Sequence, residues 1–427
     1  MRYRIHADTV LTIDDAFHIF QPCQLTWEHG VIVSVGPQDS DTSPVDQVIN
    51  MAGGIVMPGF YNGHNHAAMT MLRGLADDSP FFEWLETHIW PREARLSAGD
   101  IYAGTLLAAV EMIKSGTVAF ADMYFEMDAV ARATEQSGLR GWLCRGLVGN
   151  EDPDFAKLDQ SVRFAQDWQS KASGRIVPML GPHAPYTCSP DYLARVAEVA
   201  VANDLGVQIH LAESAAEMEQ MQQLYGKTPI GVAWEAGLFE SRLVIAHGVH
   251  ARPEDLPYLQ GMTGGIVSCP ISNAKLGNGI MPYAMLAGHG IPLGLGTDGA
   301  ASTNSLDMFL EMKAMAWMQK LSQGRPEAFQ ARTALTMATR GTAEILGSPG
   351  GVLAPGRPAD FIVVDGTHAQ MTPQIDAVSN VVYAATGADV LYTVVQGEIL
   401  MAEGLLTTLD EKAITEEARN RLEHLLG

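Results

Sequence analysis

The chain of 427 residues has only four cysteines, at positions 23, 144, 188 and 269. They are scattered without any Cys-x-x-Cys pair, so the sequence offers neither a zinc-finger spacing nor a disulfide framework. It also lacks a charged-then-apolar N-terminal signal, and it lacks the run of about 18 apolar residues that a membrane-spanning helix needs. We therefore predict a cytoplasmic protein without a membrane partner.

Positive charge is scarce as well. Lys and Arg number 27 against 49 Asp and Glu, which gives a formal net charge of -22, and no Lys/Arg-rich patch occurs. An acidic surface repels phosphate backbones, so nucleic acid is not an expected partner. The remaining composition, with 47% hydrophobic and 18% charged residues, is that of an ordinary globular protein. A small-molecule substrate is compatible with this charge.

After Pro58 a short β-rich run followed by a longer helical stretch recurs along the chain. The predicted strands are 54–60, 117–125, 139–147, 175–183, 206–214, 242–250, 264–272 and 291–299. Ser189, Thr228 and Asn304 are the expected N-caps of three intervening helices. Strands that alternate with helices predict a closed parallel barrel or a doubly wound sheet, and eight of them fit a (β/α)8 TIM barrel directly.

The two ends of the chain have a different pattern. Residues 1–57 and 349–427 contain strand-like runs separated by Gly, Pro and turn dipeptides, and 410–427 is an amphipathic helix. We therefore expect a metal-dependent barrel at 58–348 and a small β-sandwich domain with a closing helix, built from both chain ends.

Reactive side chains gather at the predicted carboxyl ends of the barrel strands, where such barrels place their chemistry. His64 and His66 lie two positions apart in "FYNGHNHAAM", and on a strand both would project to the same side. The other strand-end side chains are His183, His210, Glu213, His247 and Asp298. One such histidine alone would be structural more often than functional, but their joint placement indicates a nitrogen-and-oxygen metal site.

The number of metals is predicted from the fourth strand. A second metal would need a bridging carboxylated Lys or Glu there, and "LGPHAPY" contains neither. We expect one divalent metal per chain, zinc first, with Fe²⁺ or Mn²⁺ as alternatives.

Four blocks of sequence carry a resemblance to a known family. They are "PGFYNGHNHAAMTMLRGLADD", "GPHAPYTCSP", "SNAKLGNGI" and "LGTDGAASTNSLDMF". In this order they resemble the amidohydrolase superfamily, and within it the 5′-methylthioadenosine/S-adenosylhomocysteine deaminases, which are related to the triazine chlorohydrolases. The likeness extends over nearly the whole chain.

The resemblance implies a role for each strand-end residue. The implied metal ligands are His64, His66, His210 and Asp298. Glu213 would move protons between water and the substrate, His247 would position the water, and Asp298 would pass a proton to the departing amine.

The resemblance also implies a set of substrate contacts. Glu93 would bind the ribose hydroxyls, and His183 would meet the purine ring. Arg145 and Lys157 would reach the 5′ substituent. The alternatives are an exposed helix-end charge for Glu93, a structural ion pair for Arg145 and a solvated loop charge for Lys157. Some relatives carry Arg at the position of Lys157, and Lys lacks the bidentate fork of Arg.

The expected activity is hydrolytic deamination of an adenine nucleoside by a metal-activated water. The candidates are 5′-methylthioadenosine, S-adenosylhomocysteine and adenosine, each giving an inosine-type product and ammonia. Guanine deamination and triazine hydrolysis are alternatives within the class, and a metal-free scaffold protein is the alternative outside it. A homo-oligomer has no signature in the sequence.

Overall fold

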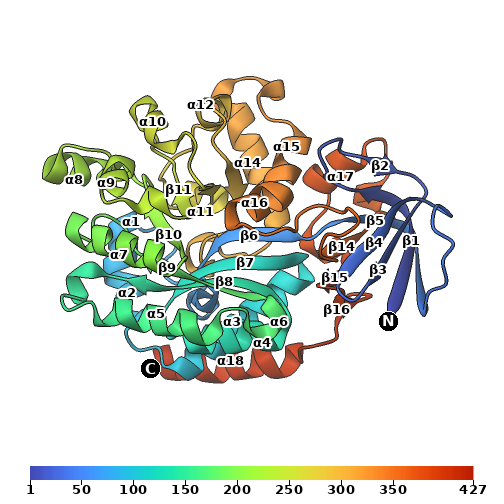
Figure 1. Cartoon of the computed structure of the whole chain (residues 1–427), viewed down its shortest axis with the longest axis horizontal. Helices are drawn as coiled ribbons and strands as arrows, with labels where there is room; N and C mark the ends of the chain where they lie inside the picture. Colours follow the sequence, from blue (N-terminus) through green and yellow to red (C-terminus); the bar gives the residue numbers. More distant parts are fainter. Residues whose placement is uncertain (427) are drawn as a thin grey trace.

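The computed structural model describes residues 1–426 and contains two separate β-sheets (Figure 1). Eight parallel strands in chain order form a nearly closed barrel, so the predicted barrel fold is confirmed. These strands are β6 (Phe60–Asn65), β7 (Thr117–Tyr124), β8 (Arg140–Leu147), β9 (Ile176–Pro182), β10 (Gly206–Leu211), β11 (Leu243–His247), β12 (Gly264–Ser268) and β13 (Leu293–Leu295).

Helices connect the barrel strands and surround them (Figure 1). Those between β6 and β10 are η1 (Ala67–Leu72), α1 (Phe81–Glu83), η2 (Trp84–Ile89), α2 (Trp90–Glu93), α3 (Ala98–Lys114), α4 (Met127–Ser137), η3 (Gly149–Glu151), α5 (Ala156–Trp168), α6 (Lys171–Gly174) and α7 (Pro190–Ala202). The later ones are α8 (Ala215–Tyr225), α9 (Pro229–Glu235), η4 (Leu238–Glu240), η5 (Pro253–Asp255), α10 (Leu256–Leu259), α11 (Pro270–Lys275), α12 (Tyr283–Gly288), α13 (Ala300–Thr303), α14 (Met308–Gln323), η6 (Pro326–Ala328), α15 (Ala331–Thr336), η7 (Met337–Gly341) and α16 (Thr342–Leu346).

The barrel closes at a seam between β6 and the chain just after β13. The backbone N–H of Asp298 donates to the carbonyl oxygen of His64 over 3.0 Å. Buried Asn62 donates from Nδ2 to Oγ1 of Thr297 at 2.7 Å and accepts from its backbone N–H at 2.9 Å. Gly296 is required here, because a Cβ would lie 2.7 Å from the backbone nitrogen of His64. The seam therefore sets the backbones of His64 and Asp298 side by side.

The first predicted strand is wrong, whereas the other seven overlap barrel strands. Residues 54–58 belong to β5 (Gln47–Pro58) of the other sheet, and the barrel begins two residues later, at Phe60. The two strands read as one apolar run in the sequence. Gly59 separates them, and it packs so closely that a Cβ would lie 2.1 Å from the Val118 side chain.

Two of the three predicted helix caps are confirmed. The side chain of Ser189 accepts the N–H of Tyr192 at the start of α7, and that of Thr228 accepts the N–H of Gly231 at the start of α9. Asn304 is not an N-cap. It ends α13 in the left-handed conformation, and Asp307 caps α14 instead.

The second sheet combines strands from both ends of the chain. Its members are β1 (Arg2–Leu11), β2 (Ile19–Phe20), β3 (Cys23–Glu28), β4 (Val31–Pro37), β5, β14 (Phe361–Asp365), β15 (Val390–Val395), β16 (Glu398–Ala402) and β17 (Leu405–Leu406). Trp27 of β3 lies 5.0 Å from Phe361 of β14 by ring centroids, although β1 and β5 separate these strands within the sheet. The sheet therefore curls over its own core, as a small sandwich does.

Two C-terminal helices lie against the barrel. The closing helix α18 (Glu411–Leu426) packs along α3, and α17 (Ala377–Tyr383) packs on α14 and α15 (Figure 1). The predicted end of the closing helix, residue 427, lies outside the described residues. The division into domains at 58–348 and at 1–57 with 349–427 stays a prediction.

Within residues 1–426, no single helix is long and apolar enough to cross a membrane. Only the pair Phe81–Glu93 and Ala98–Lys114, which is bent by 117°, reaches that length and apolar composition, and it does so with both helices taken together.

A buried ion pair joins the two sheets at the end of the barrel where the strands begin. Asp360, just before β14, accepts hydrogen bonds from Nε of Arg140 at 2.8 Å and from the hydroxyl of Tyr61 at 3.2 Å. It also accepts the backbone N–H of Gln396 at 2.6 Å. The Asp360 side chain is fully buried, so each partner depends on this one carboxylate.

We expect Asp360→Ala to lower the free energy of unfolding by about 3–5 kcal/mol, because it leaves the buried Arg140 charge without a partner. Urea denaturation followed by circular dichroism would measure the change. Glu235→Ala is the matched control, since it breaks the exposed pair with Lys227 at 2.6 Å and should cost less than about 1 kcal/mol. Equal midpoints for the two variants would show that the buried pair does not hold the sheets together.

Candidate active site

The two histidines of the His-Asn-His segment lie at the carboxyl end of β6. His64 is within the strand and fully buried, and His66 follows directly after the strand ends. Their ring centroids are 4.8 Å apart, with the ring planes nearly perpendicular. Both rings therefore face one volume, as the spacing predicts.

His210 at the end of β10 and Asp298 after β13 complete a cluster of four. Nε2 of His66 lies 3.2 Å from Oδ1 of Asp298, and Nε2 of His64 lies 3.5 Å from the same oxygen. Nε2 of His210 lies 3.4 Å from Nε2 of His66. Four tetrahedral ligands about 2.0–2.1 Å from one zinc ion lie about 3.3 Å from each other. The spacing of these atoms thus fits one small divalent cation.

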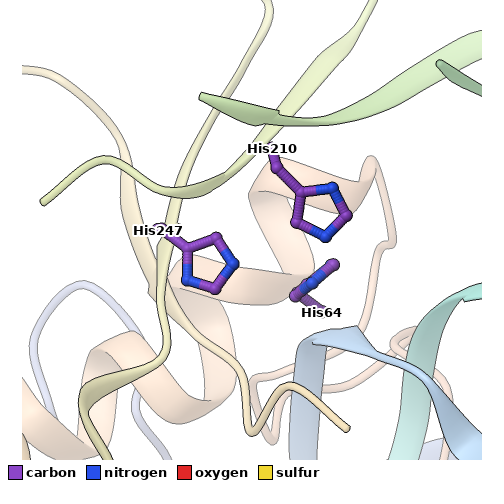
Figure 2. Close-up of side chains that lie close together, drawn as sticks. All are labelled: His64, His210 and His247. Carbon is purple, nitrogen blue, oxygen red and sulfur yellow. The ribbon is translucent and has the colours of Figure 1, made fainter. Parts of the chain in front are cut away.

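A second property of the cluster supports the same interpretation. Nε2 of His64 is buried and has no hydrogen-bond partner among the described residues. A buried nitrogen without a partner is costly unless something binds it. His64, His66 and Asp298 form one group that could hold a metal ion, and His64, His210 and His247 form another. Figure 2 shows the rings of this second group turned toward one another.

The second ring nitrogen of two candidate ligands, His66 and His210, is fixed by a backbone carbonyl group. Nδ1 of His66 lies 2.6 Å from the carbonyl oxygen of Met123, and Nδ1 of His210 lies 2.7 Å from that of His183. A carbonyl oxygen only accepts, so Nδ1 carries a proton in both rings, and each ring in its neutral form presents the lone pair of Nε2 to the cluster. This arrangement is typical of metal-binding histidines.

The carboxylate of Asp298 is held by three donors. Its Oδ2 accepts the hydroxyls of Ser272 at 2.6 Å and Ser302 at 2.9 Å, and its Oδ1 accepts the N–H of Gly299 at 2.8 Å. These bonds fix the plane of the carboxylate and leave Oδ1 facing His66.

Glu213 and His247 lie beside the cluster and are also fixed. Nδ1 of His247 donates to Oδ1 of Asn273 over 2.9 Å, which places its Nε2 3.7 Å from Oε2 of Glu213. Oε1 of Glu213 accepts Nδ2 of Asn278 over 3.1 Å. The carboxylate and the imidazole therefore share one space next to the four candidate ligands.

Left-handed backbone occurs at three of the strand ends. Ala212 has φ 53°, His247 has φ 73° and Asp298 has φ 65°. Such conformations cost about 1–3 kcal/mol each in residues other than glycine and concentrate at functional sites. Here they turn the chain sharply where the functional side chains leave the strands.

The protonation equilibria of the cluster reflect burial and one carboxylate. Burial lowers the pKa of His64 to about 4. Burial also opposes protonation of His66, but the adjacent Asp298 raises the pKa of His66 to about 9. Although burial favours the neutral acid, the adjacent imidazoles of His64 and His66 hold the pKa of Asp298 well below its usual range. An ionised carboxylate beside a positive partner is the arrangement in which a metal cation replaces the proton.

His66, His210 and Asp298 line a cavity of about 680 Å³, including the part open to solvent. Its walls are largely apolar, with side chains from Met69, Phe81, Trp84, Leu85, Trp90, Met123, Tyr124, Phe125, Val148, Tyr186 and Leu276. Oε1 of Glu93 is buried in this wall without a hydrogen-bond partner among residues 1–426, and burial raises its pKa. Polar groups of this kind in an apolar cavity are available to orient a ligand.

The structure brings most of the predicted site residues together. Those that line this cavity are His66, Glu93, His183, His210, Glu213, His247 and Asp298, with buried His64 adjacent to them. Arg145 and Lys157 do not line it. Gly146 faces the cavity, so Arg145 leaves β8 on the opposite side, and Nζ of Lys157 lies 3.2 Å from Oε2 of Glu151.

Sequence reasoning missed the groups that support the ligands and the aromatic wall. Ser272, Asn273 and Asn278 all lie in the block "SNAKLGNGI", which carried the resemblance without a role for its polar residues. The wall comes largely from "FFEWLETHIW" (81–90), whose aromatic density was the available signal.

Comparisons with known proteins agree with this geometry. The model of the amidohydrolase family matches residues 55–400. The chain is 43% identical to a 5-methylthioadenosine/S-adenosylhomocysteine deaminase of Pelotomaculum thermopropionicum, over 99% of this chain and 98% of that protein. It is 44% identical to a 5′-deoxyadenosine deaminase of Methanosarcina acetivorans, over 98% and 97%.

Solved structures give the same result. An adenosine deaminase from Xanthomonas campestris with bound zinc superposes with a TM-score of 0.95 at 30% identity, over 99% of this chain and 98% of that one. Family match, full-length relatives and fold agree with the strand-end cluster, and the chain belongs to the amidohydrolase family.

Proposed function

We propose that this protein is a metal-dependent hydrolytic deaminase that replaces the 6-amino group of an adenine nucleoside with oxygen and releases ammonia. The observation that carries the proposal is the Glu213 carboxylate, 3.7 Å from Nε2 of His247 and beside four side chains that fit one divalent cation. The full-length relatives, whose names specify adenine nucleosides, support the substrate class.

The cation would be held by His64, His66, His210 and Asp298. Zinc suits three nitrogen ligands and one oxygen ligand, with Fe²⁺ and Mn²⁺ as alternatives. When bound, a divalent cation lowers the pKa of water toward about 7 and makes it a nucleophile at neutral pH.

The side chains of this protein then move the protons. Glu213 accepts the proton of the attacking water and delivers it to N1 of the purine, which makes C6 electrophilic. His247, whose Nδ1 is fixed on Asn273, presents Nε2 to orient the water. Asp298 accepts the second proton of that water, from the hydroxyl group added at C6, and transfers it to the amino group, so that the C6–N bond breaks and ammonia leaves.

Substrate recognition would involve cavity residues other than the candidate metal ligands. The unpartnered Oε1 of Glu93 would accept the ribose hydroxyls. His183 would meet the purine ring. Its Nδ1 lies 2.9 Å from Oγ1 of Thr187. Trp84 and Trp90 line the same cavity and offer aromatic surface to the base.

The two residues that the resemblance assigns to the 5′ end of the substrate, Arg145 and Lys157, do not line the cavity. A homocysteine carboxylate would have to draw Lys157 from its pair with Glu151, whereas a methyl or thioether group needs no cation. We infer that adenosine, 5′-deoxyadenosine and 5′-methylthioadenosine react more efficiently than S-adenosylhomocysteine.

The alternative functions have less support. The names of the full-length relatives do not favour guanine or triazine substrates, and the ligand cluster beside Glu213 does not favour a metal-free scaffold. A cytoplasmic location, a homo-oligomeric state and the lack of nucleic acid and membrane partners stay predictions.

One divalent cation per chain is expected from elemental analysis. Removing it with a chelator should abolish ammonia release and lower the melting temperature, since a ligand that binds only the folded state stabilises it. Asp298→Ala is the control, because it should hold less metal and lose less stability on chelation. Two metals per chain would contradict the single site, and full activity without metal would contradict the mechanism.

Glu213→Gln should leave metal content unchanged and reduce kcat at or beyond the upper end of the range of about 10²–10⁴-fold, because Gln cannot take or deliver a proton. Glu219→Gln, on the exposed side of α8, is the matched control. Steady-state ammonia release measures both. A Glu213→Gln enzyme within tenfold of the wild type would assign the proton transfer to another group, such as Asp298.

If Glu93 binds the ribose hydroxyls, removal of the 2′-hydroxyl should lower kcat/KM. A hydrogen bond to a charged group contributes about 1.5–3 kcal/mol, or about 10–150-fold. Adenosine should therefore exceed 2′-deoxyadenosine in kcat/KM by about this factor, and Glu93→Gln should narrow the difference. Exposed Glu86→Gln should leave the difference intact. An unchanged ratio in Glu93→Gln would remove Glu93 from ribose recognition.

A further inference from the structure

A fully buried carboxyl group lies outside the cavity. It contacts two short helices whose side chains hold Asp298 and His247. Glu311 is on α14 and has no exposed surface. Its Oε2 accepts the backbone N–H of Ile271 over 3.0 Å, and its Oε1 accepts the hydroxyl of Thr303 over 3.1 Å. Burial, with Asp298 and Asp307 nearby, raises the pKa of Glu311 well above its usual range. The group therefore has two fixed partners and no access to solvent.

The first partner belongs to the helix that supports both Asp298 and His247. Ile271 is the first residue of α11 that has a backbone N–H, because the helix begins with Pro270 and proline has none. Directly after it, Ser272 donates to Oδ2 of Asp298 at 2.6 Å, and Asn273 accepts Nδ1 of His247 at 2.9 Å.

The second partner belongs to the helix that holds the other side of Asp298. Thr303 is the last residue of α13. The preceding residue, Ser302, donates to Oδ2 of Asp298 at 2.9 Å, and it also lies 3.0 Å from the Ser272 hydroxyl. One carboxyl group of α14 thus holds both short helices whose serines converge on Asp298.

These helices cannot be stable by themselves. α11 has six residues and α13 has four, whereas isolated helices shorter than about 12–15 residues are marginal in water. The N-cap of α11, Cys269, makes no side-chain cap hydrogen bond. Glu311 supplies the missing acceptor at the start of α11. It does so from α14, which has sixteen residues and packs its buried face into the main hydrophobic core.

We propose that Glu311 is a positioning residue for the deamination. Through α11 and α13 it sets the orientation of the Asp298 carboxylate and the His247 ring, although it touches neither the substrate nor the candidate ligands. The statement about the reaction rests on the function proposed above. The statement about the cation site does not, because binding of Zn²⁺ is measured without a substrate.

The test compares three substitutions on one helix. Glu311→Leu removes both acceptors at similar volume, whereas Glu311→Gln keeps an oxygen for Ile271 and offers an amide to Thr303. Lys313→Met is the matched control, since it removes a buried polar side chain of α14 that donates to the carbonyl of Ala385, away from α11 and α13.

The Zn²⁺ dissociation constant, from competition with a chromophoric chelator, and kcat and KM for adenosine are the readouts. Loss of a group that orients metal ligands typically costs 10–100-fold in affinity or activity. We expect Glu311→Leu to weaken Zn²⁺ binding and lower kcat within about this range, with KM nearly unchanged. Glu311→Gln should restore most of both values, and Lys313→Met should change only the melting temperature.

Two results would overturn the proposal. One is a Glu311→Leu protein that loses thermal stability like Lys313→Met but keeps wild-type Zn²⁺ affinity and kcat. The other is a Glu311→Gln protein whose Zn²⁺ affinity and kcat are as low as those of Glu311→Leu, because the restored acceptor for Ile271 is expected to raise both values. If Glu311→Leu does not fold, Thr303→Val removes only the donor hydroxyl, and unchanged Zn²⁺ affinity and kcat in that variant would equally overturn it.

Discussion

The seam that closes the barrel is the constraint on which the active site depends. His64 and Asp298 come from opposite ends of the barrel sequence, and they meet only because the chain after β13 bonds to β6. Asn62 fills the seam with two hydrogen bonds to Thr297, and Gly296 allows the backbones to approach. Barrel closure and assembly of the cation site are therefore one structural event. Binding of a cation to His64 and Asp298 would stabilise the closed barrel in turn.

Away from the seam, the site depends on groups that never reach the substrate. The left-handed turns at His247 and Asp298 would be unfavourable without neighbours that fix them. Those neighbours are largely polar side chains of the two short helices α11 and α13 and of the buried face of α14. The arrangement separates two tasks: the strand ends supply the reactive atoms, and the connecting helices determine where those atoms point.

The sequence could predict the barrel and the places of the candidate site residues because both follow local patterns. Alternation of strands with helices fixes the architecture, and the carboxyl ends of strands fix the positions of His210, Glu213 and His247. It could not separate β5 from β6, since the apolar run around Gly59 has no local sign of a change of sheet. The direction of the Arg145 side chain depends on the phase of β8, because a shift of one residue along a strand moves a side chain from the cavity to the opposite face. The role proposed for Glu311 depends on contacts between segments that are distant in the chain, and a local sequence pattern does not reveal such contacts.

The central claim is that water adds to C6 of an adenine nucleoside in this cavity and displaces the amino group. Incubation of adenosine with the metal-loaded protein in ¹⁸O-labelled water, followed by mass spectrometry of the product, tests it most directly. We expect inosine with one ¹⁸O atom on the purine ring and one equivalent of ammonia. Unchanged adenosine, or release of free adenine in place of inosine, would contradict it.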